Sequence, residues 1–272
     1  MNIDSLSDLA LRIRTRVLKM SYESGQSTHL GGGLSLVDLL AYLYGHELKY
    51  RVNQTDWVDR DRFILSKGHG VLGFFATLRE VGLISEEDAS SFMQNESEFI
   101  AHPIMNLDNA IESSNGSLGH GLSLGIGLAW AAKFKGLNHR VFVLMGDGEC
   151  NEGSVWEAAM NASELKMNNL VAIVDANGFQ SDGPILQASN YENLNSKWTS
   201  FGWSVLKVDG NSLEKINETF SAISYLDGPT LILARTIKGK GVDFMENNNQ
   251  WHHSRLTKNH YESALSSLEQ TK

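Results

Sequence analysis

The pattern of apolar positions alternates between strand-like runs and helix-like stripes along the whole chain. Short apolar runs predict buried strands at 63–65, 141–145, 170–174, 203–208 and 230–234. Apolar residues at helical spacing predict helices at 4–24, 36–44, 71–81, 86–94, 118–134, 155–166, 212–225 and 258–268. Strands that alternate with helices in this way are typical of an α/β fold. We therefore expect residues 1–272 to form one domain, with a parallel sheet of about five strands and helices on both faces.

Two of the predicted strands end at polar residues that can hold a ligand. Asp147, between two glycines, follows the strand at 141–145, and Asn177 follows the strand at 170–174. In open parallel sheets, ligands bind outside the carboxyl ends of the strands, so both side chains should face one crevice. Their hard oxygen atoms favour Mg²⁺ or Ca²⁺, and the neighbouring glycines would let a diphosphate lie against backbone N–H groups. The pattern predicts a metal–diphosphate anchor at the sheet edge.

Three stretches are polar or rich in glycine and show no clear periodicity. Residues 24–35 contain three consecutive glycines and end at Ser35, which we expect to cap the helix at 36–44. These glycines would let the backbone approach a ligand closely, but for this stretch alone we favour a flexible linker. The stretches at 95–117 and 236–254 are long for a compact domain. Such loops more often bind a ligand or form an interface than lack a role.

Four of the nine histidines lie in loops marked by glycine or proline, namely His29, His69, His102 and His252. Catalytic groups concentrate in such loops, and several imidazoles that converge on one cleft would suit proton transfer to and from hydroxyl and carbonyl groups. We expect ordinary surface or core positions for three others, His46, His139 and His260.

The composition excludes several classes of function. The chain has a formal net charge of −9, and its basic residues are scattered. Nucleic-acid and membrane-surface binding need clustered Lys and Arg, so we expect neither. The single cysteine, Cys150, leaves no internal disulfide and fits a reducing compartment. The first 25 residues carry charges without an uninterrupted apolar core, so we expect no signal peptide or membrane span and a cytoplasmic location.

Six separated motifs together resemble one protein family. The stretch from Gly146-Asp147-Gly148 to Asn177 resembles the thiamine diphosphate-binding motif. The other motifs resemble, in the same order, the pyrophosphate-binding half of transketolase: His29 before three glycines, Leu65-Ser-Lys-Gly-His69, His102-Pro103, Gly116-Ser117-Leu118-Gly119 and Trp251-His252. This resemblance extends from about residue 5 to residue 260, so it covers nearly the whole chain.

The resemblance implies a role for each matching residue. Thiamine diphosphate would be held through Mg²⁺, whose ligands would be Asp147, Asn177 and the backbone carbonyl of Phe179. The cofactor itself would contact His69, Gly116, Ser117, Leu118, Gly148 through its N–H, Glu149, Asn177 and His252.

The same resemblance implies catalytic roles on the substrate side of the site. His69 and His252 would also face the hydroxyl group of the donor sugar, and His253 is the alternative to His252. His29 and His102 would face the substrate. Glu152 would link the two active sites of a dimer.

A second chain would have to complete such an enzyme. A full transketolase continues with a pyrimidine-binding domain, whose glutamate activates the cofactor, and with a C-terminal domain, and no stretch here resembles either. We therefore expect an N-terminal subunit of a split transketolase, with a C-terminal partner subunit and an α2β2 assembly. It would transfer a two-carbon ketol unit from a ketose, or its phosphate, to an aldose.

Two other interpretations remain open. The chain could be the cofactor-binding subunit of a 2-oxoacid dehydrogenase or decarboxylase, although four histidines would then have no evident task. It could also be a scaffold that kept the fold without turnover. The chain departs from the family pattern at Leu30, Ala101 and His120. The last two positions are expected near substrate-facing loops, which would be consistent with a modified or nucleotide-linked sugar as substrate.

Overall fold

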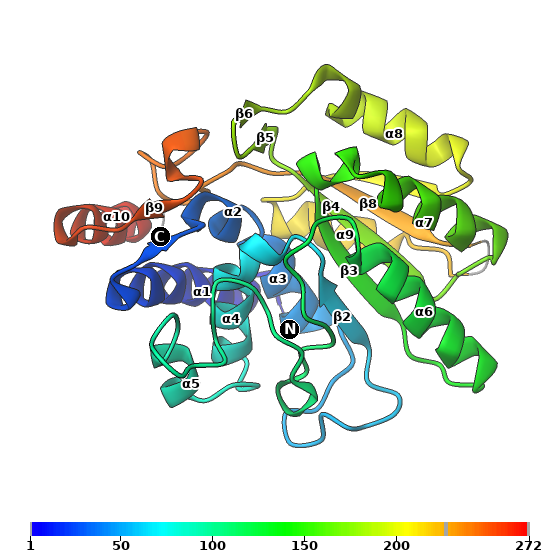
Figure 1. The fold of residues 1–272 in the computed structure, drawn as a ribbon, viewed down its shortest axis with the longest axis horizontal. Coiled ribbons are helices and arrows are strands. Elements are labelled where there is room, and N and C mark those ends of the chain that lie inside the picture. The colour runs from blue at the N-terminus through cyan, green and yellow to red at the C-terminus, as the bar shows by residue number, and fades with distance from the viewer. Residues whose placement is uncertain (1, 226–227, 271–272) are drawn as a thin grey trace.

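The computed structural model describes residues 2–225 and 228–270 and, within them, contains a central sheet of five parallel strands (Figure 1). The strands are β2 (Arg62–Leu65), β3 (Val141–Gly146), β4 (Leu170–Ala176), β7 (Ser204–Asp209) and β8 (Thr230–Arg235), in the spatial order β2-β3-β4-β8-β7. The apolar runs therefore predicted all five strands. Since β2, β3 and β4 are parallel neighbours, their carboxyl ends meet at one edge of the sheet.

Helices cover both faces of this sheet, as the alternation predicted. Alternate side chains of β3 face opposite sides: Phe142 and Leu144 pack in one core cluster, and Val141, Val143 and Met145 in the other. The first core contains α1 (Ile3–Ser24), α3 (Val37–Tyr42), α4 (Val71–Glu80), α9 (Leu213–Ser221) and α10 (Lys258–Gln270). The second contains α6 (Gly121–Phe134), α7 (Gly153–Glu164) and α8 (Tyr191–Ser200). The strands are consequently buried on both sides, which explains their continuous apolar runs.

The three consecutive glycines are not a flexible linker. They lie in α2 (Leu30–Ser35), in which every residue is buried. A Cβ atom on Gly73 of α4 would come within 2.4 Å of the Gly33 carbonyl oxygen, so the glycines let two helix backbones touch. The expected N-cap at Ser35 is also wrong, because Ser35 is the last residue of α2 and its hydroxyl lies 2.6 Å from Asp175 Oδ2. Tertiary burial here outweighs the low helix propensity of glycine.

Other helix boundaries differ from the expectation. α5 spans only Glu86–Ser90, and α6 starts at Gly121 rather than at residue 118. The sequence pattern missed α8, which buries only Leu194 and Trp198 and so has a short apolar stripe.

Short elements complete the fold around the sheet edge. Strands β1 (Ser27–Thr28) and β9 (Ser254–Arg255) form an antiparallel pair, which brings the segment after α1 next to the end of the loop at 236–254. Strands β5 (Phe179–Gln180) and β6 (Gly183–Pro184) form a second antiparallel pair directly after Asn177. The β5–β6 pair lies beside the carboxyl ends of the parallel strands, and the β1–β9 pair lies farther out, near α2 and α10 (Figure 1).

Candidate functional site at the carboxyl edge of the sheet

A cavity of about 580 Å³ lies at this edge, beyond the ends of β2, β3 and β4. It collects many of the residues that the sequence pattern singled out. Its lining comprises His29, Lys67, His69, His102, Gly116, Leu118, Gly146, Asp147, Gly148, Glu149, Asn151, Glu152, Asn177, Phe179, Gln180, Ser181, Asp182 and His252. Ser117, expected beside the cofactor, does not line it.

Asp147 and Asn177 face this one cavity, as expected from their places after β3 and β4. The two carboxylate oxygens of Asp147 accept separate backbone hydrogen bonds, from Gly148 N at 2.8 Å and from Gly178 N at 2.7 Å. Asn177 Oδ1 accepts a bond from Phe179 N at 3.1 Å. Burial raises the pKa of Asp147 to about 7, although the two backbone donors act in the opposite direction. A cation beside Asp147 would therefore favour its ionised form strongly.

Two lysines contribute positive charge to this edge, and the sequence pattern did not single them out. Lys67, two residues after β2, lines the cavity and pairs with Asp175. Lys238, three residues after β8, places Nζ 2.8 Å from His252 Nδ1 and 2.5 Å from Asn249 Oδ1. Burial, followed by repulsion from Lys67, lowers the pKa of Lys238 to about 8. Both lysines could have been identified from the sequence, because each follows shortly after a predicted strand, as Asp147 does.

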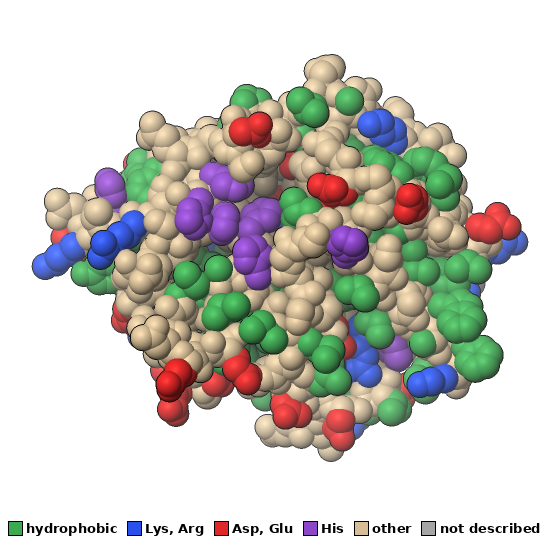
Figure 2. All heavy atoms as spheres, in the orientation of Figure 1, with side chains coloured by type: hydrophobic (Ala, Val, Ile, Leu, Met, Phe, Trp, Pro, Cys, Tyr) green, Lys and Arg blue, Asp and Glu red, His purple; other side chains and the backbone are tan. Residues whose placement is uncertain are grey.

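The four histidines expected at the site gather in one cluster, and His253 joins them. The His29 ring centroid lies 5.5 Å from that of His69, 6.2 Å from His102, 5.3 Å from His252 and 4.6 Å from His253. Figure 2 shows histidine side chains gathered in one surface patch. The pairing of β1 with β9 explains this proximity, because His29 follows β1 and both His252 and His253 precede β9. His252, and not His253, lines the cavity.

Burial lowers the pKa of four imidazoles of the cluster, those of His29, His69, His102 and His252. Burial, followed by repulsion from His253 and other neighbouring groups, lowers the pKa of His29 to about 3. Burial and then Lys238 lower the pKa of His252 to about 4, and burial keeps the pKa of His69 well below its ordinary value. At neutral pH these rings are uncharged, so each has one ring nitrogen that can donate a hydrogen bond and one that can accept.

Three other residues that the sequence analysis singled out differ in their burial and in whether they line the cavity. Glu149 is 2 % exposed and accepts hydrogen bonds from Ser66, Gly119 and Gly146, so it borders the cavity with its oxygens largely occupied. Glu152 is exposed at the N-cap of α7. His120 is exposed at the start of α6 and does not line the cavity.

The fold and the site together define an α/β domain with a ligand cavity at the carboxyl edge of a parallel sheet, where an acid–amide pair and two lysines face a histidine cluster. The family model described as "Transketolase, thiamine diphosphate binding domain" matches residues 8–268, and the chain belongs to this family. The resemblance carried by the sequence motifs and the predicted fold class are both confirmed.

This chain is similar both to transketolase subunits of about its own length and to longer transketolases. It is 38 % identical over 266 residues to a subunit of the apulose-4-phosphate transketolase of Phocaeicola vulgatus, covering 97 % of this chain and 94 % of that one. It is 35 % identical over 242 residues to a 6-deoxy-6-sulfo-D-fructose transketolase subunit of a Clostridium species, covering 89 % and 88 %. The structure of Campylobacter jejuni transketolase matches with a TM-score of 0.90 and 29 % identity, over 99 % of this chain and 43 % of that chain. The chain thus spans nearly all of the subunits but less than half of the longer transketolase.

Two features are absent from the described part of the chain. No helix in residues 2–225 and 228–270 is long and apolar enough to cross a membrane. Over the same residues, no three His, Cys, Asp or Glu side chains lie together in a way that could hold a metal ion. A metal at Asp147 would therefore need amide or carbonyl oxygens, or ligands from outside this chain.

Proposed function

We propose that this chain binds thiamine diphosphate with Mg²⁺ and acts, together with a second polypeptide, as a transketolase. The pair transfers a two-carbon ketol unit from a ketose or ketose phosphate to an aldose-type acceptor. The observation that carries the proposal is the single cavity in which the Asp147–Asn177 pair and four histidines meet. The near-complete coverage of relatives named as transketolase subunits supports a two-chain enzyme.

The residues present fit a metal-bound diphosphate. Asp147 is buried and has a raised pKa, so a divalent cation would compensate the cost of ionising it. Each of its oxygens accepts one backbone hydrogen bond and retains a second acceptor position for a metal. We assign Asp147, Asn177 and the Phe179 carbonyl as the Mg²⁺ ligands. Lys67 and Lys238 offset the charge of the diphosphate, and the N–H of Gly148, which donates to Asp147 Oδ1 at 2.8 Å, is shared with the diphosphate when it binds.

The chain contributes orientation and proton transfer. When bound, thiamine diphosphate supplies a thiazolium that acts as the electron sink for breaking the ketose carbon–carbon bond. His69 and His252 line the cavity as neutral imidazoles and exchange hydrogen bonds and protons with substrate hydroxyl groups, His252 through Nε2 because its Nδ1 lies 2.8 Å from Lys238 Nζ. His29 and His102 orient the substrate. Gly116 and Leu118 line the cavity and form the wall beside the cofactor rings, whereas Ser117 lies in the same loop without lining the cavity, and Glu149 borders the cavity with most of its acceptor positions taken by protein groups.

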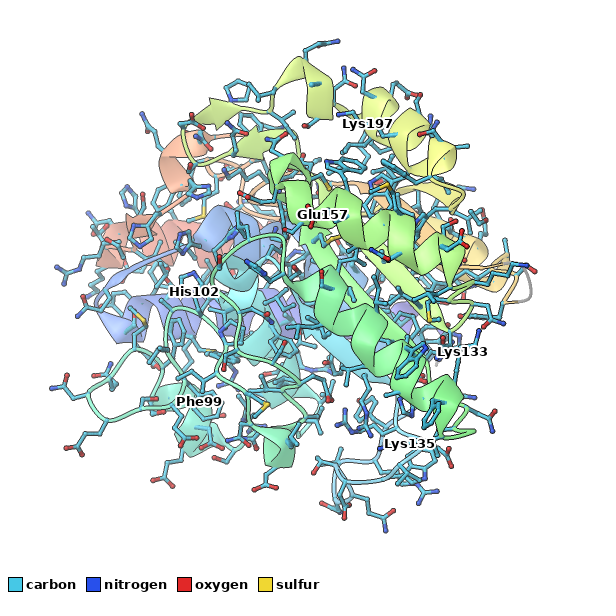
Figure 3. The ribbon with its side chains drawn as sticks, turned by 45° about the vertical axis from the view of Figure 1, so that its right-hand side comes forward. Phe99, His102, Lys133, Lys135, Glu157 and Lys197 are labelled. Carbon is cyan, nitrogen blue, oxygen red and sulfur yellow. The ribbon has the colours of Figure 1, made fainter. Side chains whose placement is uncertain are left out.

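A further polypeptide completes the assembly, which we propose to be α2β2 with a pyrimidine-binding partner chain. The outer face of α6 supports this, because Trp130 is 50 % exposed and Phe134 is 78 % exposed, and their rings stack at 5.4 Å. Figure 3 shows α6 and α7 side by side at this face. Glu152, exposed at the start of α7, links two copies of the site.

We also propose that residues 1–272 form one pyrophosphate-binding domain and that the enzyme works in the cytoplasm. A reducing compartment fits the single cysteine, Cys150, which is buried and free. Sugars or sugar phosphates are the substrates, and nucleic acids and membranes are not partners.

The test mixes the purified chain with the polypeptide encoded beside it and measures ketol transfer with thiamine diphosphate and Mg²⁺. We expect transfer by the mixture that depends on both additions and none by this chain alone. Decarboxylation of pyruvate by the same mixture is the control for a 2-oxoacid enzyme. Robust transfer by the isolated chain would refute the two-chain model.

A further inference from the structure

We propose that Glu149 is a positioning residue that holds the loop at 115–119 against the ends of β2 and β3 and thereby shapes one wall of the cavity. Gly116 and Leu118 of this loop line the cavity directly. The effect of the loop on cofactor affinity rests on the proposed function, but its anchoring by Glu149 does not.

The Glu149 carboxylate joins three separate segments of the chain. Oε1 accepts hydrogen bonds from the Ser66 hydroxyl after β2 and from Gly119 N at 2.9 Å. Oε2 accepts a bond from Gly146 N at the end of β3, at 3.1 Å. With three donors and 2 % exposure, the carboxylate has one acceptor position left, so its main partners are protein groups rather than a ligand.

A second set of bonds extends this anchor into α6 and α7. The Ser66 hydroxyl, which donates to Glu149, accepts a bond from Gly121 N at 3.1 Å. On the other side of the loop, the Ser154 hydroxyl donates to the Gly119 carbonyl at 3.0 Å. Both backbone polar groups of Gly119 are therefore bonded to side chains from the elements that frame the site.

The loop is also packed too tightly to accept side chains at its anchor points. Gly119 has a φ of +85°, and a Cβ atom there would lie 2.6 Å from Ser154 Oγ and 2.7 Å from Glu152 Cβ. A Cβ atom on Gly121 would lie 2.4 Å from Ser66. At the other end of the loop, a Cβ atom on Gly116 would lie 3.6 Å from His102 Cδ2. This is an ordinary van der Waals distance, so Gly116 lies beside His102, and loosening the anchor at Gly119 would change the wall of the cavity next to that ring.

A carboxylate is required at this position because every partner is a donor. In Glu149→Gln the side chain keeps its size but has one oxygen and one NH₂ group. Whichever way the amide turns, its NH₂ faces at least one backbone N–H, so one backbone bond is lost. Ser66→Ala is an independent variant that removes one donor to Glu149 and the acceptor of Gly121.

The experiment measures amide hydrogen exchange over residues 113–121 in the full chain, with Glu87→Gln, exposed on α5, as the matched control. For Glu149→Gln we expect exchange in this segment to be about tenfold faster, the effect of losing one net hydrogen bond of typical strength, with β3 and β4 unchanged. Ser66→Ala should accelerate the same segment, and the control should not. Unchanged exchange in both variants, or equal acceleration in β3 and β4, would overturn the anchoring.

A second measurement titrates thiamine diphosphate with Mg²⁺ by calorimetry. We expect the Kd of Glu149→Gln to rise at least fivefold while the Kd of Glu87→Gln stays at the wild-type value. Faster loop exchange with unchanged affinity would overturn the role of the wall in binding. If the wild-type chain bound no cofactor even when mixed with the second polypeptide, the proposed function would fail instead, and the exchange data alone would decide the anchoring.

Discussion

Lys67 Nζ lies 2.5 Å from Asp175 Oδ2, and the two side chains are 1 % and 0 % exposed. The pair joins the turn after β2 to the carboxyl end of β4 at the base of the cavity. Burial tends to raise the pKa of Asp175, but the Lys67 ammonium and the hydroxyl donors Ser35 and Thr236 outweigh it and keep that pKa below its ordinary value. The Asp175 carboxylate therefore stays ionised inside the protein, and its charge depends on its buried partner.

Removing one member of this pair should destabilise the fold strongly. In Lys67→Met the carboxylate of Asp175 loses its cation, and we expect the free energy of unfolding to fall by about 3–5 kcal/mol. Urea denaturation measures this loss. The double variant Lys67→Met with Asp175→Asn removes both charges and should recover much of it. A single variant as stable as the wild type would show that the pair contributes nothing to folding.

Asp147→Ala should abolish metal-dependent cofactor binding. It removes the buried carboxylate that we assign to Mg²⁺, and loss of groups even outside the direct ligands of a metal costs roughly 10–100-fold in affinity. We therefore expect the Kd for thiamine diphosphate in the presence of Mg²⁺ to rise by more than about 100-fold in calorimetry. Asp108→Ala, at an exposed position in the loop before α6, is the control. If Asp147→Ala binds like the wild type, the anchor assignment is wrong.

The depressed pKa of His29 makes stability depend on pH. The folded chain has a pKa of about 3 at His29, against the ordinary value of 6.5, so the unfolded chain binds more protons between these values. The free energy of unfolding should consequently fall as pH drops through this window. Asp147 acts in the opposite direction, because its raised pKa of about 7 lets the folded chain take up a proton first.

The comparison of wild type with His29→Asn separates these two effects, since Asp147 is common to both. Between pH 7 and pH 5, we expect the wild type to lose more stability than His29→Asn in urea denaturation. The same change in both proteins would mean that His29 is protonated equally in the folded and unfolded states.

Two helical glycines should respond oppositely to alanine. At Gly73 of α4 a Cβ atom would lie 2.4 Å from the Gly33 carbonyl oxygen, and forcing the helices apart should cost about 1–3 kcal/mol. At Gly127 of α6 a Cβ atom meets nothing within 4 Å, and the higher helix propensity of alanine should stabilise the isolated chain by about 0.5–1 kcal/mol. Thermal unfolding of both variants checks the prediction. A neutral Gly73→Ala would show that α2 and α4 can separate without loss.

The local sequence pattern was enough to predict the five strands of the central sheet, most of the longer helices along the chain and the position of the acid–amide pair. A strand buried on both faces produces an apolar run, and a helix buried on one face produces a stripe, so both can be detected within a few residues. Asp147 and Asn177 could be placed in one crevice because parallel strands share a carboxyl edge. Where the apolar stripe was short, as in α8, the pattern predicted nothing.

Contacts between distant segments determine which polar groups meet and how buried they are, and these became visible only in the folded chain. Lys67 and Asp175 are 108 residues apart, and the burial of three glycines in α2 depends on contact with α4. Glu149 was expected at the cofactor, but two donors from distant segments, Ser66 and Gly119, and a third from nearby Gly146 occupy most of its carboxylate. Burial and charge pairing are properties of neighbours in space, and most of those neighbours are far away along the chain. The local pattern therefore located this site, while long-range packing set the protonation and the hydrogen bonds of its residues.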